Sequence, residues 1–222
     1  MEEYIITPQF LNEIFNNNDT NKFYKLIISK IDRCDFDNIL TWCKKYDNTN
    51  FNNILFDAFN NKDILIGNNI LNHCVKISYQ KLIEFMIEHV LNSKQCLRLF
   101  HYCCDYGNIE PIKLLLKRGI DINHENCKIF DIACRNQNPE ILKLLLDHGL
   151  HIDYNNDNIK SGITFIIRMK NIGIIKLFLS YGIDFSFLNK ISQKERITRE
   201  EEIINILQDH GVYMSKIYKL LF

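Results

Sequence analysis

The sequence predicts an all-α solenoid, a stack of about seven helix-turn-helix pairs with projecting turns or hairpins between them. Two observations lead to this prediction. One amphipathic segment recurs four times and ends each time in glycine, and apolar triplets continue the same spacing towards the N-terminus. The composition agrees with a folded chain, because 46% of the 222 residues are hydrophobic and 24% are charged.

The repeated segment is a short helix with one apolar face. Its clear copies span 108–122, 138–152 and 171–185, and a weaker copy spans 202–212. In the first copy, Ile112, Leu115 and Leu116 have the spacing of one helix face. The predicted helix of each copy ends at Gly119, Gly149, Gly182 or Gly211. Glycine adopts the positive φ that ends a helix at little cost, so each copy predicts a helix followed by a projecting turn or hairpin.

The residues just before three of these glycines are cationic or titratable. They are Arg118, His148 and His210. Such side chains are favourable at the negative end of the helix dipole. We therefore expect them to interact with the last turn of their helices.

A second helix precedes each copy, since residues 99–108 align with residues 129–138. Together the two helices resemble the ankyrin repeat, whose pattern is T-P-L-H-x-A-A-x-x-G-H-x-E-x-V-x-L-L-L-x-x-G-A-D. The matching residues of the first copy are Phe100, His101, Cys103, Cys104, Gly107, Glu110 and Leu114 to Leu116. The resemblance implies an ankyrin-repeat solenoid that acts in protein–protein interaction, without catalysis or cofactor.

The copies depart from the ankyrin pattern at the start of their first helices. The Thr-Pro pair is absent, and Asp131 and Thr164 stand at the histidine position. In the third copy Ile166 and Ile167 replace the small pair. We therefore expect looser helix starts and less regular packing in that copy.

The repeat spacing divides the chain into three predicted regions. Residues 97–189 hold three clear ankyrin repeats, residues 1–96 hold divergent ankyrin-like repeats, and residues 190–222 form a divergent capping repeat. The apolar triplets centre near residues 27, 55, 86, 115, 145, 178 and 207. A separate N-terminal helical bundle is the alternative for residues 1–96.

The chain holds 36 isoleucines and 27 asparagines but only two alanines, a bias that reflects A/T-rich codons. The asparagine tracts at 16–18 and 52–53 are accordingly interpreted as loops or frayed helix ends. Degenerate ankyrin chains of this composition resemble those of giant, mimivirus-type DNA viruses, which implies a viral origin.

The eight cysteines are interpreted as free, buried side chains, because none forms a C-x-x-C pair and the cysteines of the repeats replace alanine. His101 and Cys104 could meet on a helix, but the ankyrin resemblance assigns His101 a structural role. A metal cluster of His124, His148, His151 and Cys127 is likewise disfavoured, because His148 recurs with the repeat and the other two histidines lie on predicted turns. We therefore predict no catalytic residue, no metal and no cofactor.

The charge and the apolar pattern exclude other partners. Lys and Arg total 27, equal to Asp and Glu, so no bulk attraction to nucleic acid is expected. No apolar run is long enough to span a membrane, and the acidic start lacks the features of a signal peptide. We expect a monomeric protein that is not secreted and acts inside the cell, in the cytoplasm of an infected host.

The predicted function is a protein–protein interaction scaffold that binds one host or viral partner through its first helices and turn tips. The partner-binding residues are expected where the repeat pattern leaves positions free: Tyr102, Asp105, Tyr106, His124, Glu125, Arg135, Asn136, Tyr154 and Arg168. The alternative is an adaptor that recruits a host ubiquitin ligase to a bound target. Residues 214–222 are expected to cap the last repeat or to dock a partner.

Overall fold

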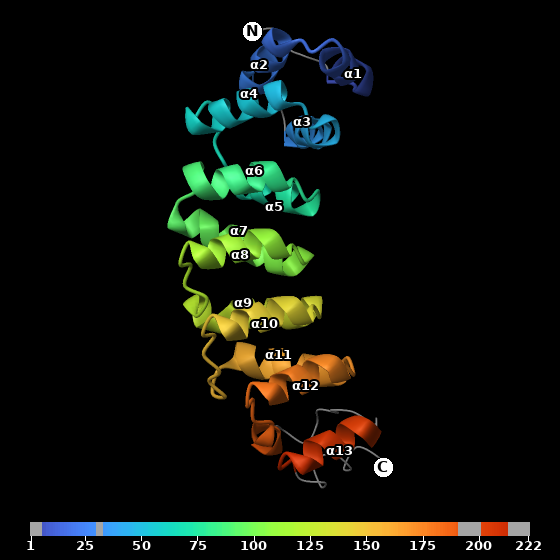
Figure 1. Cartoon of the computed structure of the whole chain (residues 1–222), viewed down its shortest axis with the longest axis vertical. Coiled ribbons are helices and arrows are strands. Elements are labelled where there is room, and N and C mark those ends of the chain that lie inside the picture. The colour runs from blue at the N-terminus through green and yellow to red at the C-terminus, as the bar shows by residue number, and fades with distance from the viewer. Residues whose placement is uncertain (1–5, 30–32, 191–200, 213–222) are drawn as a thin grey trace. The chain divides into compact units, whose positions relative to one another are not determined.

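The computed structural model describes residues 6–29, 33–190 and 201–212. Within these residues the chain forms thirteen α-helices, a π-helical turn and a 3-10 turn, and no strand (Figure 1). The all-α prediction is therefore confirmed. The turns that follow Gly119 and Gly149 contain no hairpin strands.

The helices follow one another in pairs. The first helices of the pairs are α1 (Pro8–Asn16), α3 (Arg33–Tyr46), α5 (Asn68–Lys76), α7 (Ser93–Tyr106), α9 (His124–Asn136) and α11 (Asp157–Arg168). The second helices are α2 (Thr20–Ile28), α4 (Thr49–Asn60), α6 (Gln80–Phe85) with its π-helical extension (Met86–Val90), α8 (Ile109–Lys117), α10 (Pro139–Asp147) and α12 (Ile172–Ser180). A 3-10 turn (Ser186–Lys190) and α13 (Glu201–Asp209) follow. Six of the seven predicted apolar triplets lie in these second helices or the π-helical extension, and the seventh, near residue 207, lies in α13.

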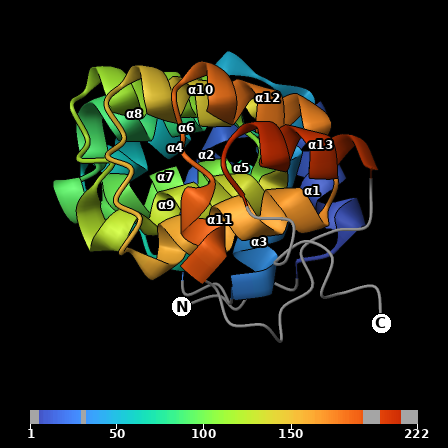
Figure 2. The same cartoon turned by 90° about the horizontal axis from the view of Figure 1, so that it is seen from below.

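The chain divides into two compact units, residues 1–120 and 121–222. In the first unit, first helices pack on first helices and second helices on second helices, as in α5 with α7 and α2 with α4. The second unit repeats this arrangement, with α9 against α11 and α10 against α12. Figure 2 shows α10 and α12 in one layer of this unit and α9 and α11 in the other. Each unit is thus two layers of helices around a shared apolar core.

A single residue with positive φ joins the two helices of each pair. These residues are Asn18, Asp47, Ser78, Gly107, Gln137 and Lys170. The next residue caps the second helix. Its side chain accepts a backbone hydrogen bond at Asp19, Asn48, Asn138 and Asn171. Many asparagines therefore have a structural role as helix caps.

The interpretation of Asn52 and Asn53 as a loop or frayed end is wrong. Both lie inside α4, and Asn52 is only 5% exposed. The Tyr79 hydroxyl donates a hydrogen bond to Asn52 Oδ1, and Asn52 Nδ2 donates to Asp47 at 3.2 Å. Because its polar atoms are bonded, the amide can be buried without a large desolvation cost.

The titratable residues before the glycines behave in two ways. The Nδ1 atoms of His148 and His210 lie 2.8 and 2.7 Å from the carbonyls of Leu144 and Ile206, in the last turns of their own helices. Arg118 instead reaches the preceding pair, where its guanidinium donates hydrogen bonds to the carbonyls of Ile87 and Leu91. The expected contact with the helix end is therefore made by both histidines, while Arg118 connects two pairs of the first unit.

The third repeat packs closely through a glycine. A Cβ at Gly162 of α11 would lie 2.9 Å from Cys134 Sγ and 3.0 Å from the Phe130 ring, both on α9. Ile166 and Ile167, which replace the small pair, are fully buried. Close approach of the two first helices has therefore moved from the small pair to Gly162.

Candidate functional site

The three candidate residues of the first unit lie on the last turns of α7. Tyr106 is 42% exposed, Asp105 is exposed, and Tyr102 is half-buried. The opposite side of this helix packs in the core, because Cys103 and Cys104 are fully buried. The left-handed Gly107 ends the helix immediately after Tyr106, with a φ of 79°. The two tyrosine rings are thus presented on a firmly packed helix end.

Arg135 of the second unit connects two neighbouring first helices. Its Nε donates to Asp131 Oδ2 at 2.9 Å on α9, and its guanidinium reaches Ser161 Oγ at 3.3 Å on α11. The guanidinium carbon also lies 5.4 Å from the centre of the Phe165 ring. The hydrogen bond with Asp131 raises the pKa of the Arg135 guanidinium. Arg135 therefore has a structural role although its side chain is exposed. Of the other two candidates on these helices, Asn136 is half-buried and Arg168, at the end of α11, is exposed.

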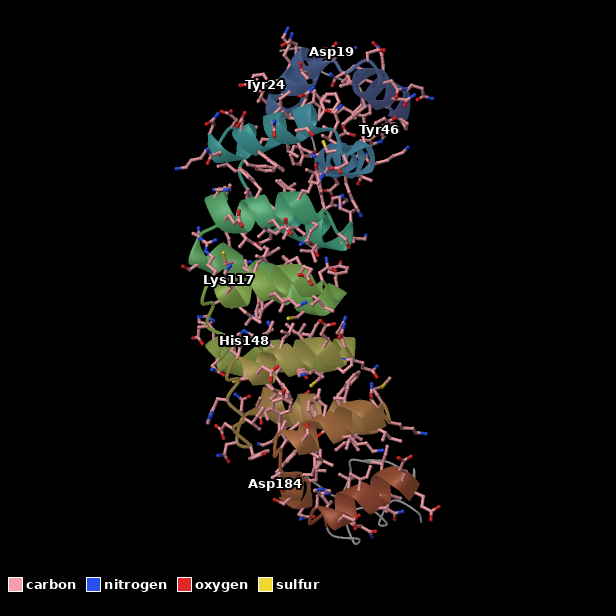
Figure 3. The ribbon with its side chains drawn as sticks, viewed as in Figure 1. Asp19, Tyr24, Tyr46, Lys117, His148 and Asp184 are labelled. Carbon is pink, nitrogen blue, oxygen red and sulfur yellow. The ribbon has the colours of Figure 1, made fainter. Side chains whose placement is uncertain are left out.

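The turn residues differ in how firmly they are held. The Tyr154 hydroxyl accepts a hydrogen bond from the backbone N–H of Asp184 at 2.7 Å, and its ring stacks on Phe187 at 5.7 Å. Tyr154 therefore links two successive turns of the second unit (Asp184 is labelled in Figure 3). His124 is exposed at the start of α9, and the side chain of Glu125 lies outside the described residues.

The cysteines are buried thiols with raised pKa values. Cys43, Cys74, Cys96, Cys103, Cys104, Cys127 and Cys134 are free and buried, and the side chain of Cys34 lies outside the described residues. Burial raises the pKa of the Cys103 and Cys104 thiols, so both stay protonated at neutral pH. Cys127 Sγ lies 3.6 Å from the carbonyl of His151. Among the described residues, no three His, Cys, Asp or Glu side chains group as a metal site would require.

An aromatic cluster on α3 is not among the candidate residues that the sequence indicated. Trp42 and Tyr46 stack with ring centres 5.4 Å apart and planes inclined by 12°. Lys45 Nζ lies over both rings, 4.9 Å from the Trp42 ring centre and 5.6 Å from that of Tyr46. The Tyr46 hydroxyl donates to Asn12 Oδ1 of α1 at 2.8 Å. Tyr46 is labelled in Figure 3. The signal in the sequence was the single tryptophan, followed four residues later by a tyrosine.

Polar contacts join α3 to α5 beside this cluster. His73 Nδ1 of α5 lies 3.5 Å from Asp37 Oδ2, and its Nε2 lies 3.1 Å from Thr41 Oγ1. The ammonium of Lys44 donates to the carbonyl of Ile77 at the end of α5. The Thr41 hydroxyl donates to the backbone carbonyl of Asp37 at 2.9 Å. These side chains therefore connect α3 to α5 through polar contacts.

Within the described residues, no helix has the length and apolar character needed to cross a lipid bilayer. This agrees with the pattern of short amphipathic helices.

Comparison with known proteins agrees with this architecture. Residues 100–189 match the family model for ankyrin repeats in three copies, the region that holds α8 to α12 and the second half of α7. A protein of Acanthamoeba polyphaga mimivirus that is called an ankyrin repeat protein is 26% identical over 108 residues, which is 48% of this chain. The aligned segment spans only 17% of that viral protein. No solved structure matches the chain significantly. Residues 100–189 thus belong to the ankyrin repeat family.

Proposed function

We propose that the chain is a non-catalytic scaffold that binds one protein partner through the exposed first-helix face of its ankyrin repeats. Ankyrin repeats are generally protein-interaction modules, and a family model for them matches residues 100–189. The observation that carries the proposal is the end of α7, where Tyr106 is 42% exposed on a helix that is otherwise tightly packed. A rigid, amphipathic ring loses little conformational entropy when it is covered by a partner.

The candidate residues of the second unit support the same function in a different way. Arg135 and Arg168 place cations on the first helices of the second unit, and His124 is exposed where α9 begins. Arginine and tyrosine are the residue types that carry much of the energy of protein interfaces. Tyr154 is half-buried, and its hydroxyl and its ring both have intramolecular partners.

The relative from a mimivirus supports a viral origin, and hence an intracellular role in the cytoplasm of an infected cell, with a host or viral protein as the partner. We expect a monomer in solution. The adaptor alternative depends on residues 213–222, which lie outside the described residues.

Site-specific photo-crosslinking tests the binding face. A benzoylphenylalanine placed at position 106 of the full chain, expressed in Acanthamoeba cells, should crosslink one protein that mass spectrometry identifies. The same group at Lys117, which is exposed on second helix α8, is the matched control (Figure 3). Crosslinking at Lys117 equal to that at position 106 would contradict the proposed face.

Binding to the captured partner then measures the contribution of the anchor. Tyr106→Ala should weaken the affinity by about 1–2 kcal/mol, or roughly fivefold to thirtyfold. Lys117→Ala should leave the affinity unchanged. Normal binding by Tyr106→Ala together with loss of binding by Lys117→Ala would place the partner on the second-helix layer instead.

A further inference from the structure

We propose that the first unit carries a second protein-binding surface on the exposed face shared by α3 and α5. It consists of Trp42, Lys45 and Tyr46 of α3 with His73 and Lys76 of α5, and we name it the α3–α5 patch. Its ligand is an acidic protein segment that also carries apolar side chains. The patch lies outside residues 100–189, so it is separate from the candidate residues of the ankyrin repeats.

The aromatic part of the patch is a preformed anchor. Trp42 and Tyr46 are half-buried, and both rings pack on the buried Phe15, at 5.9 and 5.1 Å between ring centres. The hydrogen bond from the Tyr46 hydroxyl to Asn12 fixes the outer ring at its polar end. Because core contacts and this bond already hold both rings, covering their remaining exposed area costs little ordering entropy.

The charged part of the patch is basic. Lys45 and Lys76 are exposed, and neither pairs with a carboxylate among the described residues. The neighbouring acid, Asp37, faces the imidazole of His73 at 3.5 Å. Lys44 is occupied by the carbonyl of Ile77, which leaves Lys45 and Lys76 as the cations available to a ligand. The patch therefore presents two unneutralised ammonium groups beside an aromatic pair.

The second-helix layer beside α3 and α5 has the opposite charge. Asp57 of α4 and Glu88 of the π-helical extension are exposed, and Glu84 of α6 is half-buried. The exposed Lys81 of this layer is already paired with Asp47. An acidic segment is thus attracted by the α3–α5 patch and not by the second helices α4 and α6 of the same two pairs, which gives the segment one favourable face there.

The register of the repeat defines where the patch ends. In the pairs that begin with α3, α5 and α7, the residue two positions before the left-handed residue is Lys45, Lys76 and Asp105, respectively. The residue five positions before the left-handed residue is Trp42, His73 and Tyr102 in the same three pairs. The aromatic row continues onto α7 while the basic row stops, because Asp105 reverses the charge. The acidic ligand is therefore confined to α3 and α5.

A single-stranded nucleic acid is the competing ligand for a surface of aromatic and basic residues. A base would need an open ring face, and Tyr46 and Lys45 already lie over the Trp42 ring. The chain also has a formal charge of zero, which provides no bulk attraction to phosphate. These two observations favour the acidic protein segment.

Tryptophan fluorescence of the full chain tests the proposal, because Trp42 is its one tryptophan and reports on the patch alone. The probes are a peptide of four Glu-Leu-Ser repeats, the matched peptide with glutamine for glutamate, and an oligothymidylate of similar length. The acidic peptide should change the emission of Trp42 saturably, and the glutamine peptide should bind about tenfold more weakly or not at all. Raising the salt concentration should weaken the acidic peptide further.

A charge-reversed variant assigns the effect to the patch. The double variant Lys45→Glu with Lys76→Glu should raise the dissociation constant of the acidic peptide about tenfold or more. The control is Lys25→Glu with Lys117→Glu, which changes the net charge equally at two exposed second-helix positions and should shift the constant less than about twofold. Circular dichroism checks that both variants fold, and the milder Lys45→Gln with Lys76→Gln should show a smaller loss in the same direction.

Three results would overturn the proposal. They are an emission of Trp42 that the acidic peptide does not change, an equal loss of binding in both double variants, and tighter binding of the oligothymidylate than of the acidic peptide. The last result would assign the patch to single-stranded nucleic acid. None of these outcomes depends on position 106, so the proposed function of the ankyrin repeats is tested separately.

Discussion

The helix pairs before residue 97 and the ankyrin repeats after it end their helices with different residues. After residue 97, glycine supplies most of the positive φ angles at helix ends, at Gly107, Gly119, Gly149 and Gly182, while Gln137 and Lys170 adopt them without being glycine. Before it, Asn18, Asp47, Lys62 and Ser78 adopt the same kind of backbone conformation without being glycine. The two regions thus share the positive-φ backbone conformation at helix ends, whereas the glycines that identify the repeat in the sequence are replaced upstream. This supports the proposal that residues 1–96 are divergent repeats.

The two regions also differ in how their cores are filled. Near the N-terminus, Phe15, Phe23 and Phe51 form an aromatic cluster with ring centres 4.5 to 5.6 Å apart. Between α9 and α11, Ala133, Cys134 and Gly162 allow close helix approach instead. A repeat can therefore keep its spacing with either large rings or small side chains, provided that the volume is filled.

The largest expected effect tests whether the upstream pairs are packed as firmly as the repeats. Phe51→Ala removes a fully buried ring and should cost about 4 kcal/mol of unfolding free energy. Chemical denaturation followed by circular dichroism measures this loss. Tyr24→Ala, at a 44% exposed position on α2, is the control and should change stability by less than about 0.5 kcal/mol. A loss below about 1 kcal/mol for Phe51→Ala would show that the aromatic cluster is not a rigid core.

Close helix packing in the repeat region predicts the next effect. Gly162→Val should destabilise the chain by about 2 kcal/mol, because its Cβ would lie 2.9 Å from Cys134 Sγ. Gly173→Ala on α12 is the matched control. Its Cβ would make an ordinary contact at 3.6 Å, so the better helix propensity of alanine should stabilise the protein by up to about 1 kcal/mol. Equal thermal unfolding of the two variants would show that α9 and α11 do not approach so closely.

Substitutions at the left-handed residues of the two regions should change the unfolding free energy in opposite directions. Gly149 has a φ of 83° and open space around it, so Gly149→Ala should cost about 1 kcal/mol through backbone strain alone. Lys62 has a φ of 64°, so Lys62→Gly should stabilise the chain by up to about 1 kcal/mol. Urea denaturation of both variants measures the two shifts. A destabilised Lys62→Gly would mean that the upstream turn does not have the repeat's backbone conformation.

The smallest effect concerns the cations that lie two residues before the left-handed residue. Arg135→Ala loses an ion pair with Asp131 and a ring contact with Phe165, and should cost about 1 kcal/mol. Lys45→Ala loses only its exposed ring contacts and should cost about 0.5 kcal/mol. Lys128→Ala, at an exposed position of α9, should be neutral. If Arg135→Ala were neutral as well, its contacts across α9 and α11 would contribute nothing to stability.

The type and spacing of the helices could be predicted from the sequence. Ile112, Leu115 and Leu116 do lie on the buried face of α8, and Gly149 does end its helix with positive φ. These features are local, because a helix with one apolar face and a residue without Cβ can be recognised within a few positions of the chain. The role of Asn52 could not be predicted. The sequence alone does not distinguish an asparagine that results from codon bias from one that makes buried hydrogen bonds.

The surroundings of the candidate residues were decided only by the tertiary structure. The sequence indicated that Arg135 and Tyr154 are exposed candidates, but not that Arg135 lies against Phe165 or that Tyr154 binds the backbone of Asp184. Each contact joins residues about one repeat apart, and no periodic pattern within a single helix specifies which side chains meet across that distance. The apolar period therefore determined the helix pairs, whereas the packing of one pair on the next determined which polar side chains remain available to a partner.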